Sequence, residues 1–236
     1  MPVTRNDSQR DFATTLAEME PDFYYTRGLY LDFEGSGKGY EHILSLFWPM
    51  NPGPERFGWI WREPGESTIT RAQLDEALNQ MGCSRFAPET IVVFSGGVDR
   101  INEQVRFEQI FGEDVFPNAE WIDLLRPLRR SRTTRKRIRE GRRVMKIGRT
   151  IQDNSLEALE LEFGIHRSQS IRTADHIYSD GVQGDIRILD LAKRVIDGEA
   201  SSAEESRLYE YCRHDVSGMF QVARLSQKIV ERPPGY

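Results

Sequence analysis

Two acidic residues, Asp32 and Glu34, stand two positions apart in an otherwise apolar stretch, residues 28–35 (GLYLDFEG). This stretch reads as a β-strand, and because side chains alternate along a strand, both carboxylates would lie on the same face. Two like charges about 6.5 Å apart along the backbone repel each other unless a cation lies between them or water reaches both. The pair therefore indicates either a site for a hard metal ion or the solvated acidic face of a half-exposed edge strand.

Two further positions carry carboxylates that can complete such a site. Tyr211 and Asp215 lie four residues apart in a long helix-forming segment, so they would share one helix face. Asp99 follows a short apolar run, residues 91–94, and ligands of open α/β sheets usually bind beyond the carboxyl ends of such strands. Four carboxylates from three places can hold two divalent ions, and the absence of Cys/His clusters favours Mg²⁺ or Mn²⁺.

Asp99, Tyr211 and Asp123 can also be explained by structural roles. Asp99 follows a Gly-Gly turn, where an aspartate often caps a helix. Tyr211 can be a core residue of an amphipathic helix. Asp123 interrupts an apolar strand-like run and is either a fifth acid near the site or an edge residue.

The order of the expected elements predicts the fold class. Residues 28–35, 42–48 and 57–61 read as three strands, and turn-forming residues separate them. Further along, strands at 91–94 and 121–125 alternate with helices at 70–81 and 100–111, and helices follow at 155–163, 173–177, 185–196 and 201–230. Three antiparallel strands followed by strands alternating with helices predict an α/β protein with a mixed sheet flanked by helices, the order of ribonuclease H-like folds.

Length and composition favour one such domain. At 236 residues and 38% hydrophobic, the chain can build a single sizeable core, predicted at 28–230, with a helical extension at 1–27 and a tail at 231–236. Two cysteines far apart argue against a disulfide framework. Residues 1–20 have no hydrophobic signal core, and no apolar run reaches membrane length. We therefore expect a cytoplasmic protein with no membrane partner.

Charge is concentrated in one basic stretch, residues 126–149. It holds twelve lysines or arginines and one acid, a charge of +11, while the rest of the chain carries −16 and the whole chain −5. Such asymmetry is typical of a protein that binds a polyanion at one place, although a solvated basic segment that balances an acidic body is the alternative. The expected nucleic-acid-binding residues are Arg129, Arg130, Arg132, Arg135, Lys136, Arg137, Arg139, Arg142, Arg143 and Lys146.

Three short motifs carry a resemblance to a known family. Residues 31–34 (LDFE), the acid after the apolar strand and residues 211–216 (YCRHDV) resemble the three motifs of the DEDD 3′–5′ exonucleases in their tyrosine form. Residues 121–130 (WIDLLRPLRR), followed by Ser-Leu-Glu at 155–157, resemble more narrowly the YprB-like ribonuclease H-like nucleases. The resemblance covers roughly residues 29–225.

The resemblance implies a metal-dependent nuclease, expected to act as a 3′–5′ exonuclease on single-stranded DNA or RNA. It implies Asp32, Glu34, Asp99 and Asp215 as ligands of two Mg²⁺ or Mn²⁺ ions, and Tyr211 as the residue that orients the attacking water. Residues 95–99 (SGGVD) are one residue shorter than the family's second motif and lack its Asn and Phe. The alternatives are therefore a catalytically impaired nucleic-acid-binding module of the same fold, or a partner within a larger DNA-processing complex.

Overall fold

The computed structural model describes residues 5–21, 28–35, 41–49, 54–95, 101–132, 144–146, 149–151, 155–167, 176–178 and 185–231. At its centre is a five-stranded sheet in the order β3-β2-β1-β4-β5. The strands are β1 (Gly28–Gly35), β2 (Glu41–Trp48), β3 (Arg56–Trp61), β4 (Thr90–Val93) and β5 (Glu120–Asp123). The first three pair antiparallel, whereas β1, β4 and β5 pair parallel. The predicted α/β class and mixed sheet are thus confirmed.

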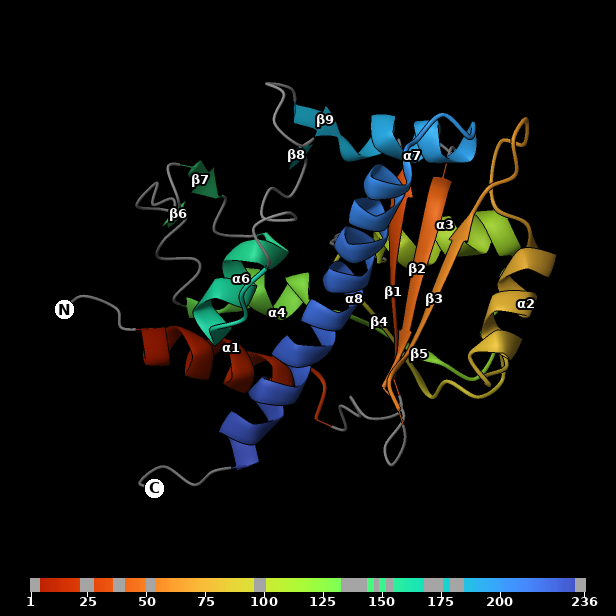
Figure 1. Cartoon of the computed structure of the whole chain (residues 1–236). Helices are drawn as coiled ribbons and strands as arrows, with labels where there is room; N and C mark the ends of the chain where they lie inside the picture. The colour runs from red at the N-terminus through yellow and green to blue at the C-terminus, as the bar shows by residue number, and fades with distance from the viewer. Residues whose placement is uncertain are drawn as a thin grey trace.

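Helices cover both faces of this sheet (Figure 1). The helices α2 (Arg71–Gln80) and α3 (Asn102–Phe111) pack on one face. On the other face the long helix α8 (Ser202–Glu231) packs against β1 and β2. It is joined there by α1 (Arg5–Met19), α4 (Leu125–Arg130), α6 (Leu156–Phe163) and α7 (Ile188–Ile196).

The strand β1 lies in the middle of the sheet, so the interpretation of an edge strand is wrong. Its alternation is as predicted: Leu29, Leu31 and Phe33 are buried in the core beneath α2 and α3. Asp32 and Glu34 therefore face α8, with helices packed on that side of the sheet. Their carboxylates are consequently only partly exposed, in a cavity beneath the helices and not on a sheet edge.

Local signals set the ends of several helices. Thr70 caps α2 by accepting from the Gln73 backbone N–H, and the Gln73 side chain accepts from the Thr70 N–H in return, which forms a capping box. Gly164 ends α6 in the left-handed conformation, at φ 76°. The final helix runs almost as predicted, from Ser202 to Glu231.

Two predicted helices are wrong in part. The strand β8 (His176–Tyr178) lies at the end of the segment expected as a helix at 173–177. The strand β9 (Asp185–Arg187) occupies the start of the segment expected as a helix at 185–196, and α7 follows it. These strands pair antiparallel, with Ile177 opposite Ile186, and this pairing outweighs the weak local helix preference.

The basic stretch is described only in part. Its beginning forms α4, and its end forms a hairpin of β6 (Val144–Lys146) and β7 (Arg149–Ile151). Arg129, Arg130 and Arg132 are exposed. The expected binding residues Arg135, Lys136, Arg137, Arg139, Arg142 and Arg143 lie outside the described residues, and Lys146 lies in β6.

The N-terminal helix α1 packs against α8, α4 and α6. Phe12 and Leu16 of α1 are buried in the core shared with α8. Cys83 and Cys212 are buried and form no disulfide. Among the helices in the described ranges, none has the length and apolar character needed to cross a membrane.

Candidate metal centre

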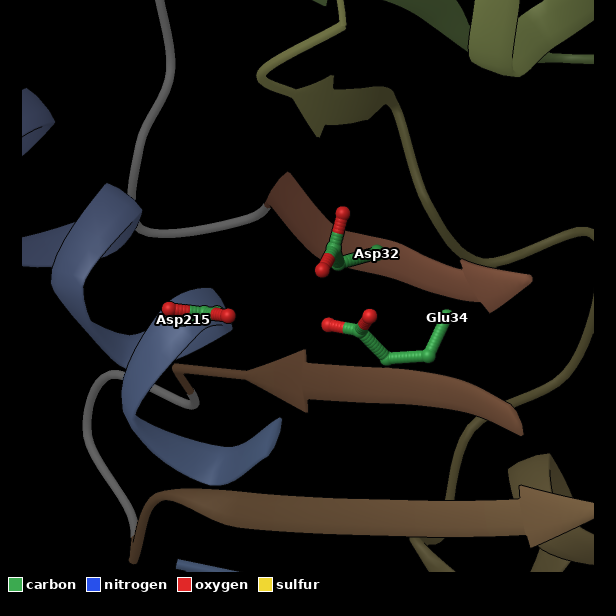
Figure 2. Close-up of side chains that lie close together, drawn as sticks. All are labelled: Asp32, Glu34 and Asp215. Atoms are coloured by element: carbon green, nitrogen blue, oxygen red, sulfur yellow. The ribbon is translucent and has the colours of Figure 1, made fainter. Parts of the chain in front are cut away.

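Asp32, Glu34 and Asp215 come together between β1 and α8. One carboxylate oxygen from each of them lies within 4.8 Å of the corresponding oxygens of the other two. Figure 2 shows two of these side chains rising from the strand and the third reaching them from the helix. Three carboxylates that converge from two elements can bind a metal ion, and oxygen-only donors suit Mg²⁺ or Mn²⁺.

The electrostatics of this carboxylate cluster show how closely its charges are packed. Burial, followed by the nearby charges of Asp215 and Glu103, raises the pKa of Asp32 well above its ordinary value. The pKa of Glu34 is raised in the same way, by burial first and then by Asp32. Burial also raises the pKa of Asp215, although Arg167 opposes the rise. A cation at this place would relieve all three carboxylates.

Arg167 lies beside the cluster and was not expected there. Its Nη2 atom is 2.7 Å from Asp215 Oδ1. The same guanidinium donates two hydrogen bonds to Glu160, from Nε to Oε2 at 2.7 Å and from Nη2 to Oε1 at 3.1 Å. His214 Nε2 lies 3.5 Å from Oε1 of that carboxylate. Burial alone would raise the pKa of Glu160, but the charge and hydrogen bonds of Arg167, together with the nearby His214, hold it below its ordinary value.

The end of α6 explains how Arg167 reaches Glu160. At Gly164 the chain turns back, and the Ile165 backbone N–H donates to the Glu160 carbonyl while Gly164 donates to Leu161. Ile165 is then buried in the core. The chain after Gly164 returns toward α6, so the Arg167 side chain lies against Glu160. The glycine stop is visible in the sequence, but nothing local indicates that the arginine after it binds an aspartate on α8.

The carboxylate cluster opens into a cavity of about 240 Å³. Besides the three acids, its lining includes Tyr211, Arg167 and the first residues of α6, Ser155 to Glu157. The Ser155 side chain accepts from the Ala158 backbone N–H and caps α6. The cavity is therefore lined by acids around the cluster and by the amino-terminal end of a helix beside it.

Glu157 is a further acid of this cavity that the sequence did not single out for the site. Its side chain is buried and lines the cavity. Glu157 and Glu160 are three residues apart on α6, so they lie on neighbouring positions of one helix face. The available sequence signal was that glutamates interrupt an otherwise apolar segment, residues 156–163 (LEALELEF).

The tyrosine lies where the spacing placed it, beside Asp215. Tyr211 is buried, lines the cavity and hydrogen-bonds to Asp215, which lowers the pKa of that carboxyl against the effect of burial. Burial, followed by the charge of Asp215, raises the pKa of the Tyr211 hydroxyl well above its ordinary value. It therefore remains a neutral hydrogen-bond donor at physiological pH.

The second expected motif lies largely outside the described residues. Asp99, expected as the fourth ligand, falls in the range 96–100, of which the structure describes nothing. Glu103, at the start of α3, lies near enough for its charge to raise the pKa of both Asp32 and Glu34. The beginning of α3 therefore lies near the carboxylate cluster.

Asp123 is a buried structural residue. Its Oδ1 atom accepts from the backbone N–H groups of Ser95 and Leu125, each at 3.0 Å. These bonds join the end of β4 to the start of α4. Asp123 is neither a member of the three-carboxylate cluster nor a residue of the cavity lining.

Comparison of the chain with models of known families, with curated proteins and with solved structures finds no match. The geometry of the site and the sequence motifs therefore carry the functional argument.

Proposed function

We propose that this protein is a metal-dependent phosphodiesterase of ribonuclease H-like fold that removes nucleotides from the 3′ end of single-stranded nucleic acid. The observation that carries the proposal is the convergence of Asp32 and Glu34 on a central strand with Asp215 on the last helix. The strand order β3-β2-β1-β4-β5, antiparallel in the first three strands and parallel thereafter, also supports it.

The residues present fit a hard divalent ion. All three donors are carboxylates, and burial raises the pKa of each, with repulsion from neighbouring acids adding to the rise for Asp32 and Glu34, as expected for ligands without their cation. A bound Mg²⁺ or Mn²⁺ would supply an activated water and charge stabilisation at the scissile phosphate. Asp32, Glu34 and Asp215 would hold one such ion, and a second ion requires a further acid such as Asp99.

The other residues of the cavity have roles of their own in this proposal. Tyr211, neutral and fixed against Asp215, can donate a hydrogen bond that orients the attacking water. Arg167 lines the same cavity and is held by Glu160 and Asp215, so it adds a fixed positive charge beside the reacting phosphate. Catalysis would therefore depend on positioning and on charge.

The basic stretch supplies the proposed contact with the substrate. Arg129 and Arg130 are exposed at the end of α4 and Arg132 just after it, near the start of the stretch 126–149, whose charge is +11. Contacts of arginine with phosphates are largely independent of base sequence and weaken steeply with salt. We therefore propose DNA or RNA as the partner, with the base identity contributing little.

A nuclease assay tests the proposal directly. The full chain is incubated with single-stranded DNA or RNA carrying a 5′ label, with Mn²⁺, Mg²⁺ or EDTA. A ladder of progressively shorter labelled products, formed only with metal and lost in Asp215→Asn, is expected. Asp114→Asn, which changes an exposed acid of a turn, is the matched control and should leave activity unchanged. Metal-independent cleavage, or full activity of Asp215→Asn, would contradict the proposal.

The alternative is a binding module that retains the fold without catalysis. The shortened second motif at residues 95–99 favours it, because the resemblance places the fourth carboxylate in that segment. Such a module would bind a labelled oligonucleotide in a fluorescence anisotropy assay yet leave it intact with Mn²⁺. If cleavage appears only with a partner protein present, the chain works as part of a larger DNA-processing complex.

A further inference from the structure

Glu160 binds Arg167, and Arg167 in turn contacts Asp215. We propose that Arg167, clamped by Glu160, is a positioning residue that holds the Asp215 carboxylate toward Asp32 and Glu34 so that the three can share one ion. This inference rests on the metal-dependent function proposed above. It assigns a role to two residues that the resemblance does not include among its site residues.

The clamp on Arg167 is rigid. Its Nε and Nη2 atoms meet opposite oxygens of Glu160, an arrangement that fixes the plane of the guanidinium. The exposed fraction of the two side chains is only 2% and 1%, so neither has room to reorient. The contact of 2.7 Å between Nη2 and Asp215 Oδ1 is therefore made by a guanidinium that cannot easily follow a displaced carboxylate.

Stability alone is a weak reason to bury these charges. Transferring charged groups from water into a core often costs more free energy than their mutual attraction recovers. Apolar side chains of similar volume usually stabilise a core better. Arg167 also lines the same cavity as Asp32, Glu34 and Asp215. Residues that orient metal ligands from behind are common in metal sites, and their loss typically weakens metal binding 10- to 100-fold.

Gly218 of α8 provides independent support, because its missing side chain leaves space for the carboxylate of Glu160. A Cβ at position 218 would overlap the carboxylate of Glu160. Gly218 lies within α8, three residues after Asp215, so its absent side chain provides space for Glu160 within an ordinary helix. A side chain here displaces Glu160, and with it Arg167, without changing any charge.

The test is a titration of the full-length chain with Mn²⁺, followed by calorimetry or by the electron paramagnetic resonance of the ion. Gly218→Ala and Arg167→Lys are compared with the wild type, each checked for folding by circular dichroism. Lysine keeps the positive charge but lacks the planar guanidinium that donates hydrogen bonds to both oxygens of Glu160. We expect both variants to bind Mn²⁺ about 10- to 100-fold more weakly.

The control is Arg194→Gln. Arg194 also makes a two-point contact with a glutamate, Glu204, at 2.6 and 3.2 Å, yet it is not part of the cavity lining. This variant should bind Mn²⁺ as the wild type does. Arg167→Gln is the stronger perturbation, but it leaves two buried carboxylates without their cation and can unfold the chain, so the first two variants carry the test.

The two proposals fail in different ways. If the wild type binds Mn²⁺ and folded Gly218→Ala and Arg167→Lys bind it equally well, the positioning role of Arg167 is overturned and the metal site stands. Alanine is the better helix former, so a Gly218→Ala protein that is more stable and retains full Mn²⁺ affinity would be decisive against the clamp. If the wild type binds no Mn²⁺, the proposed function is overturned and the role of Arg167 with it.

Discussion

Replacing Asp32 by asparagine should stabilise the metal-free protein and abolish its response to metal. The three carboxylates of the cluster approach within 4.8 Å of one another on β1 and α8. At that separation two full charges repel each other by about 3 kcal/mol for an effective dielectric constant of about 20. Asparagine retains the shape of Asp32 and removes its repulsion with both neighbouring acids.

The net gain is smaller than this repulsion, because the raised pKa values of Asp32 and Glu34 mean that retained protons already relieve part of it. We expect the free energy of unfolding in EDTA to rise by about 1–3 kcal/mol. Excess Mn²⁺ should stabilise the wild type, since a ligand of the folded state alone adds about 2.7 kcal/mol at 100 times its Kd. It should leave Asp32→Asn almost unaffected.

Denaturant unfolding near pH 7.5, with EDTA and with Mn²⁺, measures both effects. Asp114→Asn is the control, because it removes an exposed acid of a turn and should change neither quantity. An Asp32→Asn protein that is less stable than the wild type in EDTA, or that retains the full Mn²⁺ shift, would refute the electrostatic reasoning.

Three further predictions concern the surroundings of the cluster. Burial and like charges raise the pKa of Asp32 and of Glu34, so the folded state retains protons that the unfolded chain loses. The free energy of unfolding of the metal-free protein should therefore fall as pH rises above about 4. The stabilisation by Mn²⁺ should be larger at higher pH. Denaturation across pH, with and without Mn²⁺, checks this, and a stability that rises with pH in EDTA would oppose it. Asp123→Ala should cost about 1–3 kcal/mol through two lost backbone bonds and leave Mn²⁺ affinity intact, as denaturation and calorimetry would show. Replacing Arg129 and Arg130 together by glutamine should reduce the salt dependence of oligonucleotide binding by about one phosphate contact each, and an unchanged slope in anisotropy titrations would remove them from the interface.

Patterns within single elements could be predicted from the sequence. Alternation along residues 28–35 predicted correctly that Asp32 and Glu34 share a face, and the four-residue spacing brought Tyr211 beside Asp215. Both inferences need only the geometry of one strand or one helix. The order of β1 to β5 with α2 and α3 likewise follows from periodicity and turn residues.

Features that depend on distant partners could not be predicted. Whether Asp32 and Glu34 lie on an edge or in the centre depends on β4, which pairs with β1 from a later part of the chain. Arg167 reaches Asp215 only because α6 packs against α8, and no local pattern records that contact. The hairpin of β8 and β9 was missed for the same reason, since each strand has only three residues and depends on its pairing.

Diffraction at a wavelength sensitive to manganese, from crystals of the full chain grown or soaked with MnCl₂, tests the central claim most directly. The account predicts an anomalous peak between β1 and α8, at about 2.0–2.6 Å from carboxylate oxygens of Asp32, Glu34 and Asp215. No peak there in the presence of saturating Mn²⁺, or a peak bound only by other residues, would contradict it.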